Sequence, residues 1–155
     1  PVAEEAGVTL ALHPDDPPVE SLGGIPRLFR NRESFDRALE AVPSDAHGLK
    51  LCLGCFSQMG EDVPDVIRHF GDDIVFVHFR DVVGTVPEFT ETFLDAGNFD
   101  PFEAMGALQE VGFDGPVLLD HVPEIEGDTA WRHRSRAYGA GYLRCLIEAC
   151  ERGAR

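Results

Sequence analysis

Basic residues are scarce in this sequence of 155 residues. Thirteen lysines and arginines, of which Lys50 is the single lysine, stand against 28 aspartates and glutamates and give a net charge of −15. Nucleic-acid binding depends on basic patches that neutralise phosphates, so this balance argues against it. A small acidic substrate remains compatible, because local arginines and a metal ion can neutralise its charge. We therefore expect a small-molecule partner and no nucleic acid.

Long apolar runs are missing as well. No run approaches the ~20 residues that a transmembrane helix needs, and no signal peptide is evident. The sequence starts at Pro1 rather than Met, and residues 1–7 resemble the end of a preceding helix. We expect no membrane partner, a cytoplasmic location, and a segment of a longer protein.

A second CxxC motif is also absent. Cys52 and Cys55 have CxxC spacing, but a zinc ribbon requires two such pairs. A redox pair of the thioredoxin type opens a helix, whereas Cys52 ends an apolar run, so the spacing favours a metal ligand at Cys52. A redox pair and an inert buried cysteine remain the alternatives. Cys145 and Cys150 fall in a helical pattern, and reduced cysteines fit the cytoplasm.

Strand and helix patterns alternate along the whole chain. We predict strands at 8–13, 49–53, 73–79 and 116–120, and helices at 33–42, 61–70, 101–111 and 131–152. A glycine-rich turn is expected after 53. Asp100 and Pro101 form a strong helix start, with a capping carboxylate followed by proline. Long loops at 14–30 and 80–99 are candidates for function, because such loops are uncommon in compact domains.

Four consecutive strand–helix units without a hairpin signal indicate a parallel sheet with crossover helices. A complete (β/α)₈ barrel has eight such units and typically ~250 residues. We therefore expect an α/β fold in which residues 1–155 form one domain, the C-terminal half of a TIM barrel. An open, doubly wound four-stranded sheet is the alternative. Two unpaired sheet edges predict a partner, either the remainder of the same barrel or a second copy in a homo-oligomer.

Each predicted strand ends in a residue that binds divalent metals, at intervals of 39, 26 and 42 residues: His13, Cys52, His78 and Asp120. In barrels the chemistry lies where strands end, so we expect one shared metal centre. Its mixed nitrogen, sulfur and oxygen donors, spread widely along the chain, suit a catalytic metal better than a closed structural zinc site. Mn²⁺, Fe²⁺ and Zn²⁺ are all compatible.

Polar residues follow these predicted ligands directly. His121 comes after Asp120 and is expected to act as a general acid or base, the alternative being a cap on the following loop. Arg80 and Asp81 come after His78, and both are candidates for substrate binding. Arg80 is expected to bind a substrate carboxylate through both arms of its guanidinium. Further polar candidates for substrate binding lie in the first long loop: Asp15, Asp16 and Arg27.

Several of these segments together resemble one enzyme family. HPDDPP starts at His13, C-x-G at Cys52, VHFRDV at Val77, FTETFLDAGNFD at Phe89, and DH at Asp120. The same motifs in the same order occur in mannonate dehydratases, and the resemblance extends from His13 to about Tyr142.

The resemblance implies a TIM barrel close to the xylose-isomerase group, with a divalent metal, usually manganese, on the four residues listed above. It implies removal of water from D-mannonate to give 2-dehydro-3-deoxy-D-gluconate, with His121 as the catalytic histidine and Tyr138 as the nearest candidate for a catalytic tyrosine. The metal and Arg80 would stabilise the enediolate formed when the weakly acidic α-proton leaves. Alternatives are a sugar isomerase or epimerase of the same barrel group, for which a carboxylate-rich site is expected, and a non-catalytic fragment.

Overall fold

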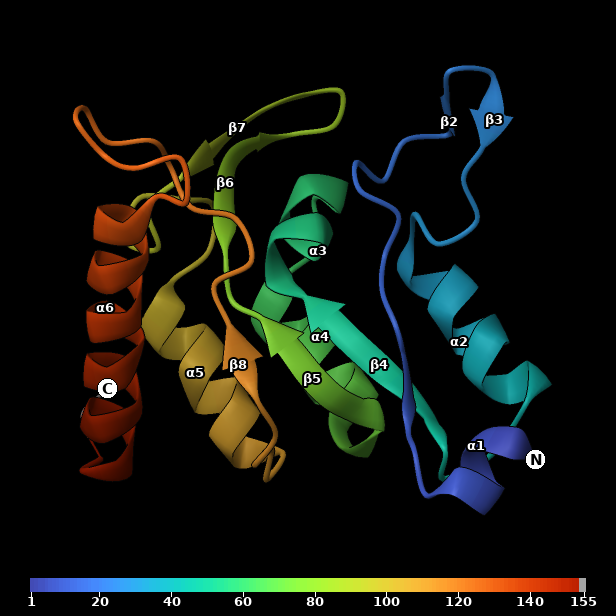
Figure 1. The fold of residues 1–155 in the computed structure, drawn as a ribbon. Coiled ribbons are helices and arrows are strands. Elements are labelled where there is room, and N and C mark those ends of the chain that lie inside the picture. Colours follow the sequence, from blue (N-terminus) through green and yellow to red (C-terminus); the bar gives the residue numbers. More distant parts are fainter. Residues whose placement is uncertain (154–155) are drawn as a thin grey trace.

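Four parallel strands form the central sheet of the computed structural model, which describes residues 1–153 (Figure 1). They are β1 (Leu10–Leu12), β4 (His47–Cys52), β5 (Ile74–His78) and β8 (Val117–Leu118). Their order in the sheet is β1-β4-β5-β8, so the four strands of this sheet lie side by side in the order in which they occur along the chain. A doubly wound sheet reverses direction at a switch point, whereas a barrel adds strands in one direction. The topology is therefore the predicted barrel type.

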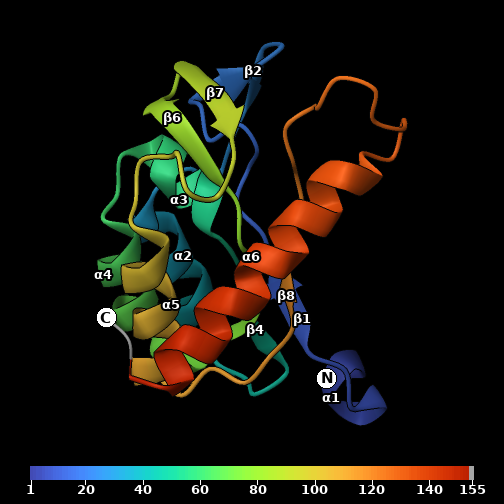
Figure 2. The ribbon, with the colours of Figure 1, turned by 90° about the vertical axis from the view of Figure 1, so that its left-hand side faces the viewer.

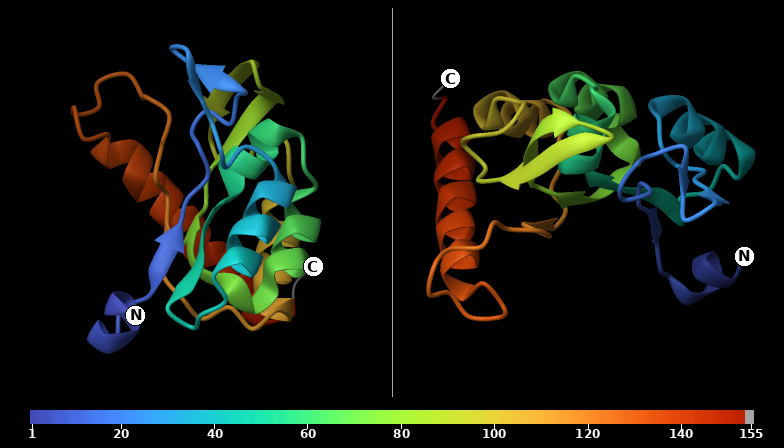
Figure 3. Two further views of the ribbon diagram at one scale, coloured as in Figure 1. Left: turned by 90° about the vertical axis from the view of Figure 1, so that its right-hand side faces the viewer. Right: turned by 90° about the horizontal axis from the view of Figure 1, so that it is seen from above.

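Helices cover one side of this sheet. They are α2 (Arg32–Ala41), α3 (Leu53–Met59), α4 (Val63–Phe70), α5 (Pro101–Glu110) and α6 (His133–Glu151), with the 3₁₀ turn η1 (Gly71–Asp73) after α4. The short helix α1 (Val2–Ala6) has no buried residue and lies apart from them, before the start of β1 (Figure 2). Figure 2 and Figure 3 show α2, α4 and α5 side by side along one face, with α6 at the β8 end. Among the helices of residues 1–153, none is long and apolar enough to cross a membrane.

The helix starts follow the capping chemistry that the sequence predicts. Asp100 caps α5, since its carboxylate accepts from the backbone N–H of Phe102 at 2.8 Å, and Pro101 occupies the first turn. Asp62 caps α4 in the same way, accepting from the N–H of Asp65 at 2.9 Å. These caps satisfy N–H groups that have no partner inside the helix.

The hydrophobic core lies between the sheet and these helices. Leu49, Leu51 and Val77 point to the helical side and are at most 1% exposed. Phe56 of α3 packs between two other rings, with centroid distances of 5.3 Å to Phe35 and 5.9 Å to Phe70 (residue 70 ends α4). Side chains alternate between the two faces of a strand, so the intervening residues point to the opposite side.

We expect Phe56→Ala to destabilise the protein by about 3–5 kcal/mol, because it leaves a cavity in this cluster of rings. The urea midpoint of the full-length protein should fall accordingly. Phe102→Ala is the matched control: Phe102 is 39% exposed, so its loss should change the midpoint little. Equal midpoints for the two variants would contradict the assigned core.

None of the helices α2 to α5 lies on the other side of the sheet (Figure 2, Figure 3). Lys50 lies there with its ammonium 4.8 Å from the centre of the Phe76 ring. Leu118, which is paired with His78, is 54% exposed. In a closed barrel this side is the interior, which side chains fill.

Two β-hairpins contradict the expectation that the chain contains none. One joins β2 (Ser21–Leu22) to β3 (Ile25–Pro26), and the other joins β6 (Asp81–Thr85) to β7 (Glu88–Thr92). The first has a two-residue turn, Gly23–Gly24, in which both residues have positive φ. That turn chemistry is a known hairpin signal. The segment 80–99, expected as a loop, contains the second hairpin.

The expected glycine-rich turn after residue 53 is wrong, because helix α3 starts there. Gly54 lies inside the helix, where glycine weakens the local preference for helix. A Cβ at this position would lie 2.7 Å from Cγ of Arg80. Gly54 is thus required by the close approach of Arg80, a contact between distant segments that local sequence does not reveal.

Candidate metal centre

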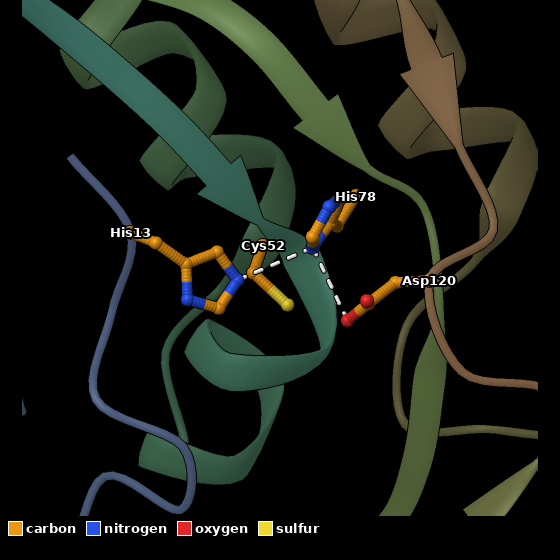
Figure 4. A group of neighbouring side chains, drawn as sticks. All are labelled: His13, Cys52, His78 and Asp120. Atoms are coloured by element: carbon orange, nitrogen blue, oxygen red, sulfur yellow. Dashed lines mark hydrogen bonds and ion pairs between the residues drawn. The ribbon is translucent and has the colours of Figure 1, made fainter. Parts of the chain in front are cut away.

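The four predicted metal ligands converge at the C-terminal edge of the sheet (Figure 4). His13, Cys52, His78 and Asp120 each offer one ligand atom, and these atoms all lie within 4.8 Å of one another. Strand register explains the convergence: Cys52 pairs with His78, which pairs with Leu118, two residues before Asp120. Paired residues share a face of the sheet, which places Cys52 and His78 together. Asp120 lies just beyond the end of β8, where its backbone has a positive φ of 57°.

One of the two histidines, His13, is oriented by a neighbouring acceptor. His13 Nδ1 lies 2.7 Å from the carbonyl oxygen of Pro14 and donates to it, so His13 Nε2 is left for the cluster. That nitrogen is 3.2 Å from His78 Nδ1, which is 3.1 Å from Asp120 Oδ2. A second hydrogen bond that fixes ring orientation is typical of metal-binding histidines.

The environment of Cys52 favours its thiolate, which is the form that binds metals. Burial raises the pKa of the Cys52 thiol, but hydrogen bonds with Cys55, His13 and His78 and the charge of Arg80 outweigh burial and hold the pKa well below its usual value. Burial lowers the pKa of His13, yet its hydrogen bond with Cys52 and the charge of that residue raise it overall. The Cys52–His13 contact therefore shares a proton that a metal would displace.

This donor set fits a divalent metal ion. It combines two imidazole nitrogens, one thiolate and one carboxylate, all buried or half-buried. The set is too poor in sulfur and too widely spaced in sequence for a typical closed zinc site. The cluster is thus a possible site for a divalent metal, as the strand ends predict.

Arg80 lies beside the cluster and is 1% exposed. Its guanidinium contacts the carboxylates of Asp16 at 2.6 Å, Glu91 at 2.8 Å and Asp120 at 3.3 Å, and donates to Cys55 Sγ at 3.3 Å. Burial lowers the pKa of Arg80, but the surrounding thiol and carboxylate groups raise it overall. Arg80 thus supplies a permanent positive charge among acidic groups.

Arg80 was expected to bind a substrate carboxylate, whereas in the structure carboxylates of the protein itself surround its guanidinium. A second acidic group, formed by Asp16, Asp120 and His121, has ligand atoms within 4.8 Å of one another. The guanidinium already contacts both of these carboxylates, so Arg80 provides the cation there and we assign no second metal ion. Its bonds hold the loop after β1 to the ends of β5 and β8.

His121 lies next to Asp120 and is about half exposed. Its Nδ1 is 3.0 Å from Glu91 Oε1, and its Nε2 is 3.8 Å from Asp120 Oδ2. The hydrogen bond with Glu91 raises the pKa of His121 above its usual value. A partly exposed imidazole beside the metal ligands has the placement that a general acid or base requires.

Asp15 is placed differently from Asp16. Its carboxylate accepts from the N–H of Phe29 at 2.8 Å and from Arg27 Nη1 at 3.2 Å. Both bonds close the loop after β1 on itself. The structure does not bring Asp15 or Arg27 into the cluster of ligands, and the contacts of both are structural.

Asp81 is fully buried at the start of β6. Its carboxylate accepts from Ser57 Oγ at 2.9 Å and from the N–H groups of Val82 at 2.7 Å and Phe99 at 3.2 Å. Burial raises the pKa of Asp81, and these hydrogen bonds offset only part of that rise. Asp81 therefore anchors the segment after the hairpin through a buried carboxylate that already has protein donors, and its contact with substrate stays a prediction.

Tyr138 lies on α6 and is 43% exposed. Its ring packs at 5.2 Å from Phe93 and 6.2 Å from Tyr142, and burial together with a hydrogen bond to Asp95 raises its pKa. Tyr138 and His121 line the same small hollow. The partner of the Tyr138 hydroxyl is Asp95, which is not one of the four candidate ligands.

Two further residues at the site were not singled out as participants from the sequence. Glu91 on β7 contacts both Arg80 and His121. Glu91 lies inside the FTETF motif, but residues 80–99 were predicted as a loop. The sequence therefore did not indicate that Glu91 lies on a strand beside Arg80 and His121. Cys55 is a free thiol that forms a hydrogen bond with Cys52, and Cys52 occupies the N-cap position of α3 without a side-chain capping bond. The objection that Cys52 does not open a helix is therefore wrong, although its two histidine neighbours still favour the role of ligand.

Comparison with known proteins agrees with this arrangement. A family model described as D-mannonate dehydratase (UxuA) matches residues 1–155. Mannonate dehydratase of Thermotoga neapolitana is 40% identical over 96% of this chain and 44% of its own length. Mannonate dehydratase 2 of Halalkalibacterium halodurans is 37% identical over 96% and 46%. The chain thus spans a little under half the length of these curated relatives.

Solved structures show the same fold. A mannonate dehydratase from Streptococcus suis serotype 2 superposes with a TM-score of 0.92 and 32% identity, over 99% of this chain and 46% of that one. A D-tagatose 3-epimerase-like protein, at 19% identity, gives a TM-score of 0.72 over 99% and 52%. At that identity the second likeness concerns the fold alone.

Proposed function

Because this chain belongs to the D-mannonate dehydratase family, we propose that the protein containing it is a hydro-lyase that converts D-mannonate to 2-dehydro-3-deoxy-D-gluconate and water. The observation that supports this most directly is the cluster of His13, Cys52, His78 and Asp120 within 4.8 Å, directly beside His121. A metal-binding group next to an imidazole suits the loss of water from a sugar acid.

We propose that His13 Nε2, Cys52 Sγ, His78 Nδ1 and a carboxylate oxygen of Asp120 hold the metal. Mn²⁺ is our first choice from the family resemblance, and Fe²⁺ or Zn²⁺ would also accept these donors. The bound metal would polarise oxygens of the sugar acid and so stabilise negative charge next to its carboxylate.

The chain's own residues supply proton transfer and charge. The proton on C2 leaves, the hydroxyl on C3 departs as water after gaining a proton, and the resulting enol becomes the 2-keto acid. His121 Nε2 faces the ligand cluster and is the atom we assign to one of these proton transfers. Arg80 lowers the energy of the anionic enediolate through its charge. We assign contact with substrate hydroxyls to Asp16, whose carboxylate lies within 4.8 Å of ligand atoms of Asp120 and His121. A catalytic role of Tyr138 stays a prediction.

We further propose that residues 1–155 form the C-terminal half of a (β/α)₈ barrel in a cytoplasmic enzyme. Within the described part of the chain, β1 and β8 each pair on one side only, which leaves two sheet edges for the remaining strands. Leu10 and Leu118 are 60% and 54% exposed, consistent with surfaces that another part of the barrel covers. Assembly into homo-oligomers is a separate proposal, testable by the mass of the protein in solution.

The test is to incubate the full-length protein, loaded with Mn²⁺, with D-mannonate and to measure formation of a 2-keto-3-deoxy acid. Removal of the metal with a chelator is expected to abolish turnover, and adding Mn²⁺ back should restore it, because the donor set lies at the proposed reaction site. Aldose–ketose conversion or epimerisation without the keto-deoxy acid would instead support an isomerase or epimerase. Absence of stoichiometric Mn, Fe or Zn would favour a non-catalytic protein.

A further inference from the structure

Glu91 connects two residues of the site that come from other elements. It lies on β7, where it is paired with Val82 of β6. Its Oε1 accepts from Arg80 Nη1 at 2.8 Å, and the same oxygen lies 3.0 Å from His121 Nδ1. The carboxylate therefore stands between a buried cation and the imidazole assigned to proton transfer.

The chemistry of these groups determines where the proton of His121 lies. A carboxylate only accepts hydrogen bonds, so the nitrogen that faces Glu91 must carry the hydrogen. In the neutral ring, His121 Nδ1 is then the donor and Nε2 is left with its lone pair. That Nε2 is the nitrogen 3.8 Å from Asp120 Oδ2. The contact thus selects one of the two tautomers of His121.

We propose that Glu91 is a positioning residue that fixes His121 as the Nδ1–H tautomer with Nε2 turned toward the metal ligands. This inference rests on the proposed function for its kinetic part. A histidine oriented by a carboxylate on its far nitrogen is an arrangement that enzymes use for proton transfer.

Arg80 fixes Glu91 in turn. The guanidinium is 1% exposed and also bonds to Asp16, so it has little freedom to move. Because Arg80 can only donate, it holds the Glu91 oxygen as an acceptor in one place. The series Asp16, Arg80, Glu91 and His121 then runs from the loop after β1 to the end of β8.

A purely structural role for the Glu91 carboxylate is less consistent with its contacts. The hairpin is held by the backbone pairing of β6 with β7, and by Asn98, whose side chain bonds to both the N–H and the carbonyl of Gly84. The Glu91 hydrogen bonds and ion pairs go to Arg80 and His121, outside the hairpin strands. Loss of the carboxylate should therefore spare the hairpin and affect His121.

The first test measures the tautomer directly. Full-length protein with ¹⁵N-labelled histidine, loaded with diamagnetic Zn²⁺, is observed by long-range ¹H–¹⁵N correlation, and the His121 signals are assigned by their loss in His121→Asn. We expect the Nδ1–H form in the wild type and a shift toward Nε2–H in Glu91→Ala. An Nε2–H form in the wild type would overturn the inference even if Glu91→Ala did not fold.

The second test is kinetic. Glu91→Ala is expected to lower kcat roughly 10–100-fold, the usual effect of losing such an outer hydrogen-bond partner, with little change in KM or metal content. Glu91→Gln should recover most of kcat: Arg80 can only donate, so it selects the amide oxygen at this position and the Nδ1–H tautomer is kept. Glu88→Ala, at an exposed position on the same strand, is the matched control and should behave as wild type.

The two tests separate this inference from the proposed function. Wild-type kcat in Glu91→Ala would refute the positioning role, provided that the wild type converts mannonate. If no form of the protein converts mannonate, the proposed function fails, and the tautomer of His121 in the wild type and in Glu91→Ala alone decides the role of Glu91.

Discussion

Replacing Cys52 with serine is expected to lower metal content and turnover together. The serine hydroxyl does not ionise near neutral pH, so the site loses the one thiolate that its surroundings stabilise. Cys52 lies among His13 and His78 with its ligand atom directed at the same point as theirs. The loss of metal affinity should exceed the roughly 10–100-fold that removal of an outer hydrogen-bond partner costs.

This prediction is tested by elemental analysis and by Mn²⁺ titration of the full-length variant, alongside the mannonate assay. Cys145→Ser is the matched control, since Cys145 is an exposed thiol on α6 and far from the strand ends in sequence. If turnover in Cys52→Ser is lost at low Mn²⁺ and partly recovers at high Mn²⁺, its effect acts through the metal. Unchanged stoichiometric metal in Cys52→Ser would show that the thiol is not a ligand.

The ligand cluster was predictable because it depends on rules that act over short stretches of sequence. An apolar run that ends in a metal-binding residue predicts both a strand and the position of its C-terminal side chain. Parallel strands then place His13, Cys52, His78 and Asp120 at one edge, and the structure brings their ligand atoms together. Helix α5 was predictable for the same reason, since Asp100 and Pro101 encode its start locally.

The surroundings of the cluster depended on contacts between distant segments. Gly54 was interpreted as part of a turn, but it lies in α3. Glycine is needed at this helical position because the side chain of Arg80 occupies the space where a Cβ would stand. Arg80 was expected to face substrate, whereas Asp16, Glu91 and Asp120 surround it. Ion pairs between segments far apart in the sequence leave no local sequence pattern. The role of Glu91 at the site was missed for the same reason.

Replacing His121 with asparagine is expected to abolish turnover while the metal stays bound. Asparagine can still donate to Glu91, so the arrangement of Glu91 and Arg80 should persist. An amide does not exchange protons near neutral pH, so the proton transfer assigned to Nε2 is lost. General acid–base catalysis contributes roughly 10²–10⁴-fold, and kcat should fall by that factor.

The decisive measurement is kcat together with metal content for this variant. His69→Asn is the matched control, because His69 lies on α4 and pairs with Asp36 on the outer helical layer. If metal is lost in His121→Asn, then His121 binds the ion and the ligand set must be redrawn around it. If turnover persists, proton transfer belongs to another group, for which Tyr138, which lines the same hollow as His121, is the next candidate. If His121→Asn keeps its metal but loses turnover, the two adjacent residues have different roles: Asp120 binds the metal, and His121 acts as the acid or base.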